Sequence, residues 1–120
     1  LEHAGELFGK GLQLVNILRD LPGDLANGRC YLPVDDPGNR GDLMRKAAEW
    51  RATAREWMCH GERYAGQLNG RRVKVAVALP ALLGRETLDL LETADWAQME
   101  RGVKVGRSTV RRCLWRAWWL

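Results

Sequence analysis

Four side chains with oxygen or amide donors follow one another near the start of the sequence at helical intervals. Gln13, Asn16, Asp20 and Asp24 are spaced by three, four and four residues. At about 100° per residue, a helix would bring them within about 80° of one another around its axis. Asp20 and Asp24 would then lie one turn apart, and Mg²⁺ usually binds one or two carboxylates together with waters and substrate phosphates. Two carboxylates placed in this way can present oxygens to Mg²⁺, so a metal site at Asp20 and Asp24 is one interpretation of the polar stripe.

The helix that carries this polar stripe is otherwise apolar. Leucine, isoleucine and valine side chains point in most directions between residues 12 and 21, which is typical of a buried helix. A buried carboxylate is costly unless it is paired with a positive charge or binds a cation. The metal site has one simple competitor, in which Asp20 pairs with Arg19 or Arg29 and Asp24 only begins a turn.

Helical segments account for most of the chain, and no convincing strand is found. The four segments expected to be helical are residues 2–20, 43–68, 73–93 and 108–120. Pro80 is expected to kink the third of them. A segment rich in glycine, proline, asparagine and aspartate, residues 26–41, is expected to be a loop. Asp42 and Ser108 are the predicted N-caps of the second and fourth helices. The predicted fold class is therefore all-α.

Three stretches of the sequence carry a family resemblance. Residues 11–33, GLQLVNILRDLPGDLANGRCYLP, resemble the second aspartate-rich motif of the squalene/phytoene synthase family, LQxxNxxRDxxxDxxxGRxYxP. Residues 73–88, VKVAVALPALLGRETL, resemble the family's helix with an A-L-P core, and residues 103–107, VKVGR, resemble its basic stretch K-V-x-R. The resemblance implies that residues 1–120 are the C-terminal part of a single synthase domain within the isoprenoid-synthase helical bundle.

The resemblance also implies a specific reaction between two prenyl diphosphates. Diphosphate leaves an allylic substrate with Mg²⁺ assistance, and the double bond of a second substrate attacks the carbocation head to head. The resulting cyclopropylcarbinyl diphosphate ionises again and rearranges. Squalene synthases then add hydride from NADPH, whereas phytoene synthases lose a proton. From the stretch VKVGR we expect farnesyl diphosphate to be converted through presqualene diphosphate to squalene, with NADPH as a second cofactor. Formation of phytoene from geranylgeranyl diphosphate is the alternative.

The resemblance assigns catalytic roles to five matched residues. Asp20 and Asp24 would hold Mg²⁺ against the diphosphate and so stabilise the leaving group. Asn16 would be a further ligand of the metal, and together with Gln13 it would orient the ligands around the metal or face the substrate. Tyr31 completes the set, although packing at the exit from the helix would explain this residue equally well.

Basic side chains of the matched stretches would neutralise phosphate oxygens. Arg19 and Arg29 suit the diphosphate, because a guanidinium makes paired hydrogen bonds to phosphate. Lys104 and Arg107 resemble residues that contact the phosphates of the nicotinamide cofactor in squalene-forming members, and a surface charge pair is the simple alternative. Apolar side chains would shelter the carbocation and the prenyl chains, although each also fits an ordinary core. The candidates are Leu12, Leu14, Ile17, Val77, Leu79 and Leu83.

Some features depart from the family pattern. The sequence has no second DxxxD or DxxED, so it would supply one wall of a two-sided metal site. Pro22 removes a backbone donor between the two aspartates, and Gly23 takes a position that is often acidic in the family. The sequence begins with Leu1, so we expect a fragment or processed product that is marginally stable and prone to dimerise or aggregate.

The charge of the chain is basic and uneven. It has 19 lysine and arginine residues against 15 acidic residues, for a net charge of +4, and residues 101–120 contain no acid. A nucleic-acid-binding helical module is therefore a competing function, and a non-catalytic helical remnant is another. The nucleic-acid alternative leaves the polar stripe unexplained, because acids repel phosphates in the absence of a metal. We therefore expect prenyl diphosphates rather than nucleic acid as partners.

Other classes of protein and site are disfavoured. The longest uncharged apolar run, residues 75–83, is shorter than the ~20 residues that span a membrane, and no signal peptide is expected. Three separated cysteines without a CxxC spacing argue against a disulfide framework and predict a reducing, cytoplasmic location. Zinc is disfavoured because Cys59 and His60 are adjacent and would lie on different faces of a helix.

The last ten residues, RRCLWRAWWL, combine arginine with tryptophan. This composition suits a membrane interface, and the substrates that the resemblance implies are lipids, so peripheral membrane contact through this helix is one expectation. In the favoured alternative, Leu114, Trp115 and Trp118 dock on the helical bundle.

Overall fold

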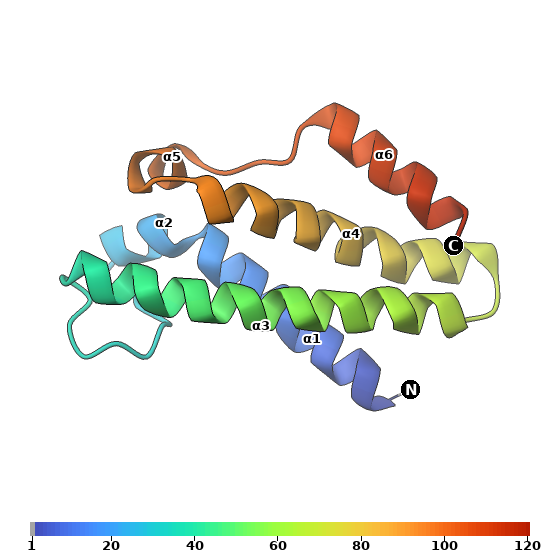
Figure 1. Cartoon of the computed structure of the whole chain (residues 1–120), viewed down its shortest axis with the longest axis horizontal. Helices are drawn as coiled ribbons and strands as arrows, with labels where there is room; N and C mark the ends of the chain where they lie inside the picture. The colour runs from blue at the N-terminus through green and yellow to red at the C-terminus, as the bar shows by residue number, and fades with distance from the viewer. Residues whose placement is uncertain (1) are drawn as a thin grey trace.

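The computed structural model describes residues 2–120 and the side chains from residue 5 onward. This part of the chain consists of six helices without a strand, which confirms the all-α prediction (Figure 1). None of the described helices combines the length and apolar character needed to cross a membrane. The helices are α1 (Glu2–Arg19), α2 (Leu21–Ala26), α3 (Arg40–Gln67), α4 (Arg71–Thr93), α5 (Trp96–Arg101) and α6 (Arg107–Trp118).

The long helices α3 and α4 form an antiparallel pair through the middle of the molecule (Figure 1). They are joined at residues 68–70, where Gly70 has a φ of 94°, a conformation that favours glycine. α1 packs across α3, and α6 lies along the outer side of α4. α2 and α5 meet at the end of the bundle where α4 finishes, in a body that measures 47 × 32 × 21 Å.

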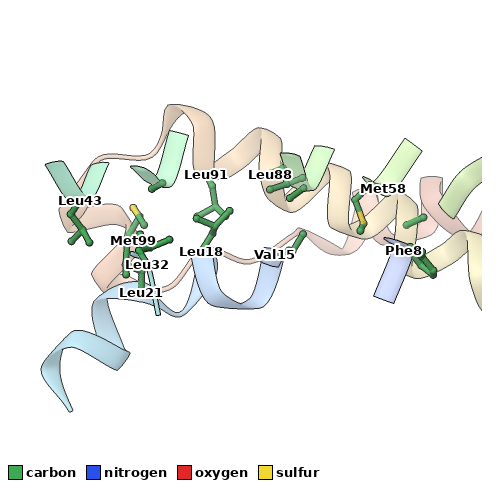
Figure 2. Packing of buried hydrophobic residues seen from close by; sticks show 13 residues of the cluster. Phe8, Val15, Leu18, Leu21, Leu32, Leu43, Met58, Leu88, Leu91 and Met99 are labelled. Carbon is green, nitrogen blue, oxygen red and sulfur yellow. The ribbon is translucent and has the colours of Figure 1, made fainter. Parts of the chain in front are cut away.

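The main core fixes the end of α1. Figure 2 shows Leu18 of α1 pointing toward Leu91 of α4, and Leu21 of α2 grouped with Leu32 and Met99. Leu18, Leu21 and Leu91 are each at most 2% exposed. Burial of a leucine side chain contributes about 1.5–3 kcal/mol. The anchoring of Leu18 and Leu21 therefore holds the two residues between them at a defined place on the surface.

A smaller core cluster joins α6 to α4 and α3. Cys113 and Ala117 of α6 pack with Ala65 of α3 and with Ala78 and Leu82 of α4. All five are at most 2% exposed. Four of these five side chains are small, which allows α6 to lie close against α4.

The prediction that Leu114, Trp115 and Trp118 dock on the bundle is wrong. These side chains are 43%, 67% and 51% exposed. α6 turns Cys113 and Ala117 toward α4, and Trp115 lies about 180° around the helix from the midpoint of that pair. The contact with α4 selects a narrow stripe of small residues, so the larger apolar side chains of α6 face outward.

Two N-cap predictions are corrected by the helix boundaries. Asn39, rather than Asp42, caps α3, and its Oδ1 accepts a hydrogen bond from the Asp42 backbone N–H at 3.1 Å. α6 begins at Arg107, so its N-cap is Gly106 and Ser108 lies within its first turn. Asparagine and aspartate are equally good caps, so residue type did not decide between Asn39 and Asp42.

The short helix α5 is not among the predicted helices. It begins with a capping box, in which the Gln98 N–H donates to Asp95 Oδ1 and the Asp95 N–H donates to Gln98 Oε1, both at 2.8 Å. The D-x-x-Q spacing is a helix-start signal that could have revealed it. The guanidinium of Arg40 lies 3.7 Å from the ring centroid of Trp96, and this cation–π contact ties α5 to the start of α3.

α4 continues as a helix through Pro80, as predicted for residues 73–93. Proline lacks the N–H that would donate to the carbonyl of Ala76 one turn earlier. Ala76 is exposed, so water can satisfy that carbonyl without cost to the core.

The thiol of Cys113 provides a test of how α6 docks. Burial raises the pKa of Cys113, and the carboxylate of Glu86 adds to the effect. Because the thiolate is the reactive form, Cys113 should react with iodoacetamide at least about tenfold more slowly than Cys30 and Cys59, which are only partly buried. Mass spectrometry of the labelled peptides would measure the three rates.

The raised pKa of Cys113 also sets a pH dependence. At a pH below the ordinary thiol pKa, roughly 8.5, the thiol is neutral and its burial stabilises the docked helix. This stabilisation is lost as the pH rises through the higher pKa that Cys113 has in the folded chain. Labelling of Cys113 should therefore accelerate more steeply than labelling of Cys30 in that alkaline range. Equal rates for the two thiols at neutral pH would show that α6 is not docked.

Candidate active site

Asp20 lies at the break between α1 and α2. Its backbone N–H donates to the carbonyl oxygen of Asn16 at 2.9 Å, and its own carbonyl accepts from the N–H of Asp24 at 2.9 Å. Pro22 occupies the first turn of α2, where its missing donor is tolerated. α1 and α2 are therefore separate helices, while helical hydrogen bonds still join Asn16, Asp20 and Asp24 turn by turn.

The carboxylate of Asp20 is paired with its neighbour Arg19. Arg19 Nε donates to Asp20 Oδ1 at 3.0 Å, and Nη2 donates to Oδ2 at 3.4 Å. The side-chain hydrogen bond to Asp20 raises the pKa of Arg19 above its ordinary value. The two side chains are 44% and 50% exposed, so the pair contributes little to stability and can exchange for another partner. This pairing is the predicted competitor of a metal site, and a metal would have to displace Arg19 from Asp20.

Arg19 and Asp20 line a cleft between the end of α1, the middle of α4 and the segment that leads to α6. The cleft has a volume of about 450 Å³. Lys104 reaches the same cleft from the 102–106 segment, which turns at Gly102 with a φ of 96°. The other lining residues are mainly apolar and include Leu83, Thr87, Val103, Val105 and Val110. One carboxylate and two cations beside an apolar lining suit a ligand with a charged head and an apolar body.

The carboxylate of Asp20 could serve as a ligand of a partly hydrated Mg²⁺ ion at the cleft. Among the side chains from residue 5 onward, no three acidic, histidine or cysteine residues come together as a complete metal cage. Mg²⁺ does not require such a cage, because it keeps waters and takes one or two carboxylates with phosphate oxygens. Asp20 offers a half-exposed carboxylate, Asp24 offers a second one turn later, and Asn16 offers an exposed amide oxygen. This set of donors would leave room for the phosphates of a ligand.

Several predicted site residues do not line the cleft. They are Gln13, Asn16, Asp24, Arg29, Tyr31 and Arg107. Gln13 and Asn16 are exposed on α1, Asp24 is partly buried on α2, and Arg107 is exposed at the start of α6. The backbone N–H of Arg29 donates to the carbonyl of Asp24 at 2.8 Å, which ties the segment after α2 to that helix.

Tyr31 does not pack as the simpler alternative suggested. Its side chain is 52% exposed, and the neighbouring Leu32, at 3% exposed, makes the core contact instead. Packing at the helix exit therefore does not explain Tyr31. Its place in the predicted catalytic set stays a prediction.

The apolar lining of the cleft differs from the predicted one. Of the six predicted wall residues, Leu83 lines the cleft. The other five pack against the two core clusters, in agreement with the alternative that they belong to an ordinary core. They are Leu12, Leu14, Ile17, Val77 and Leu79. Sequence reasoning missed Thr87, Val103, Val105 and Val110. The alternation of valine around Lys104 is the signal that could have identified two of them.

A second hollow, of about 550 Å³, lies between α3 and α4 on another face. It contains none of the predicted site residues. Arg55, which lines it, is already paired with Asp89 at 2.5 Å and with Glu92, another lining residue, at 3.3 Å. The first cleft is therefore the better candidate for a polar ligand.

Comparison with known proteins agrees with the resemblance seen in the motifs. The family model described as squalene/phytoene synthase matches residues 1–119. The chain is 33% identical to phytoene synthase 3, chloroplastic, of Zea mays over an alignment of 114 residues, in which 84% of this chain and 26% of that protein are covered. It is 31% identical to the phytoene synthase of Thermus thermophilus over an alignment of 111 residues, in which 78% of this chain and 36% of that protein are covered.

The chain thus spans between about a quarter and about a third of the length of these curated relatives. The matched region includes both Asp20 and Lys104, since the family model covers all but the last residue. No solved structure matches the chain significantly.

Proposed function

Because this chain belongs to the squalene/phytoene synthase family, we propose that it supplies one wall of the active site of a head-to-head prenyltransferase. The observation that carries the proposal is the cleft in which Asp20, Arg19 and Lys104 meet beside an apolar lining. A prenyl diphosphate has the matching parts, a highly charged head and a long apolar chain. The opposite wall, with the other aspartate-rich motif of the family, would come from the remainder of such an enzyme.

The named relatives favour geranylgeranyl diphosphate as the substrate and phytoene as the product. Both are phytoene synthases, whereas the expectation of squalene rested on the short stretch VKVGR. In a phytoene-forming reaction the last step is loss of a proton, so NADPH is not needed. Lys104 would then contact the substrate diphosphate instead of a nicotinamide cofactor, which agrees with its place beside Asp20.

The charged residues would bind and orient the diphosphate. Mg²⁺, when bound, would supply positive charge that stabilises the leaving group. Asp20 and Asp24 would hold the ion, and Asn16 would add or orient a ligand beside them. Lys104 would neutralise phosphate oxygens at the mouth of the cleft, and Arg19, once exchanged from Asp20, would bind them through paired hydrogen bonds.

The apolar residues would protect the reacting carbon chain. Leu83, Val103 and Val110 line the same cleft as Asp20, so a bound diphosphate would direct its prenyl chain along them. Exclusion of water there would limit capture of the carbocation by hydroxide or water. Gln13, Arg29, Tyr31 and Arg107 stay predicted site residues that lie outside this cleft.

Paramagnetic NMR with Mn²⁺ in place of Mg²⁺ tests the proposed function residue by residue. With a nonhydrolysable geranylgeranyl thiodiphosphate present, we expect amide signals to broaden most around Asn16, Asp20 and Asp24. The amide signal of Lys104, which lies further from the ion, should broaden less. Mn²⁺ without the analogue should broaden these signals less, because phosphate supplies part of the donor set. Broadening centred on the acidic loop at residues 35–36, or no broadening that depends on the analogue, would contradict the proposal.

The length of the prenyl chain provides the second arm of this experiment. The geranylgeranyl analogue should bind at least about tenfold more tightly than the farnesyl analogue, because its additional carbons remove more apolar surface from water. Equal affinities would argue against geranylgeranyl diphosphate as the preferred substrate. Titration of both analogues followed by the same amide signals would measure the difference.

A further inference from the structure

We propose that the outward face of α6 binds the surface of an anionic lipid membrane. The side chains concerned lie outside the candidate active site, so the proposal does not depend on the proposed enzymatic function. They form what we term the aromatic patch, which consists of Leu114, Trp115, Trp118, Trp119 and Leu120.

Tryptophan dominates the aromatic patch. Trp115, Trp118 and Trp119 are 67%, 51% and 65% exposed. The ring centroids of Trp115 and Trp119 lie 5.8 Å apart with a tilt of 60°, so the two rings form one surface. α6 runs along the outer side of α4, at the edge of the molecule (Figure 1). A contiguous apolar surface of this kind marks an interaction site for a protein or a membrane.

Basic side chains border the aromatic patch. Arg112 and Arg116 pair with glutamates of α4 and α3 at 2.8 Å and 3.2 Å, which fixes the orientation of α6. Arg107 and Arg111 are exposed, and neither forms an ion pair with the described side chains. Without such a pair, these two guanidinium groups are available to bind anions.

Arg71 orders the end of the aromatic patch. From the start of α4 its guanidinium donates to the carbonyl oxygen of Leu120 at 3.1 Å and to that of Trp118. It also lies 5.8 Å from the ring centroid of Trp118. The patch is therefore held in place before any partner binds, which lowers the entropy cost of binding.

An anionic lipid surface matches both the aromatic rings and the free arginines. Tryptophan is favoured at the level of lipid headgroups, where its ring is apolar and its N–H finds polar partners. Basic groups beside it are attracted to anionic headgroups. A second copy would bring together two faces that both carry unpaired arginines and no acid, so a symmetric contact would place like charges close to one another.

Vesicle flotation with the whole chain tests this proposal. Vesicles of phosphatidylcholine and phosphatidylserine in equal parts should carry the chain upward, and pure phosphatidylcholine vesicles should bind it at least about tenfold more weakly. Trp115→Ser combined with Trp119→Ser should weaken binding to the mixed vesicles at least about tenfold, through lost apolar contact. Arg111→Glu should weaken it by about 20-fold, because one attraction is lost and one repulsion is added.

Two variants on other helices serve as matched controls. Leu90→Ser removes an apolar side chain that is 41% exposed on α4, and Arg63→Glu makes the same change of net charge as Arg111→Glu at an exposed position on α3. Both should bind vesicles like the unchanged chain. Slow labelling of Cys113 in each α6 variant would show that α6 is still docked and that the loss arises at its surface.

Several results would overturn the proposal. One is a chain that does not float with anionic vesicles. Another is an equal loss for Arg63→Glu and Arg111→Glu, which would indicate unspecific attraction. A chain that is dimeric without lipid and becomes monomeric in the tryptophan variant would assign the patch to a second copy. Displacement from vesicles by a short RNA would assign it to nucleic acid.

Discussion

Replacing Asp20 with asparagine is expected to weaken the Mg²⁺-dependent binding of a prenyl diphosphate analogue at least about 100-fold. This loss would exceed the loss of affinity that is usual when a residue that only orients a metal ligand is replaced. The variant keeps the size and shape of the side chain but removes the negative charge from the cleft. Because Asp20 is half exposed and pairs with the exposed Arg19, the loss of this pair should hardly change the free energy of unfolding. Isothermal titration calorimetry with Mg²⁺ and with EDTA would measure the affinity.

Asp36→Asn is the matched control for Asp20→Asn. It removes the same charge from the loop between α2 and α3, where the Asp36 carboxylate accepts a hydrogen bond from the Gly38 N–H at 2.9 Å. An amide oxygen can accept the same bond, so the loop should keep its conformation and the analogue should bind unchanged. Unaffected binding in Asp20→Asn would remove Asp20 from the metal site, and equal losses in both variants would point to net charge instead.

The long helices could be predicted because each repeats its apolar residues over several turns. α1, α3, α4 and α6 correspond to the four predicted segments, with ends shifted by a few residues. α2 and α5 have six residues each, which is too short for a periodic pattern to emerge. Such helices depend on caps and on tertiary contacts, such as the stacking of Arg40 on Trp96.

The candidate site could be predicted only where it is local in sequence. Helical spacing within one segment selected Asp20, which lines the cleft, together with Asn16 and Asp24, which do not. The approach of Lys104 to Asp20 depends on how α1 packs beside α4 and on the turn at Gly102, and no spacing rule contains this information. The motif resemblance identified Lys104 for another role, and the structure shows that it lines the same cleft as Asp20.

Sequence patterning also left the outward face of α6 undecided. Val110, Cys113, Leu114, Ala117 and Trp118 fit one broad apolar stripe on a helical wheel. Close packing against Ala78 of α4 uses only the small members of that stripe, and the tryptophans are left outside. Helix periodicity gives the direction of an apolar face, whereas the width of the contact is set by the neighbouring helix.

The crossing of α1 over α3 depends on glycine, and Gly61→Ala should therefore destabilise the chain. A Cβ atom at Gly61 would lie 2.3 Å from Cδ1 and 2.8 Å from Cε1 of Phe8, which is itself buried on α1. A ring cannot bend away as a flexible chain can, so α1 must move or Phe8 must leave its rotamer. We expect the free energy of unfolding to fall by about 3 kcal/mol and the Tm by roughly 10 °C. Thermal unfolding followed by circular dichroism would measure both.

Gly66→Ala separates this packing effect from helix propensity. Gly66 is exposed on the same helix, and a Cβ atom there would meet nothing within 4 Å, so the substitution should stabilise the chain by about 0.5–1 kcal/mol. Phe8→Leu combined with Gly61→Ala should recover part of the lost stability, because the smaller side chain leaves room for the new methyl group. A Gly61→Ala chain as stable as the Gly66→Ala chain would mean that α1 does not cross α3 at Phe8.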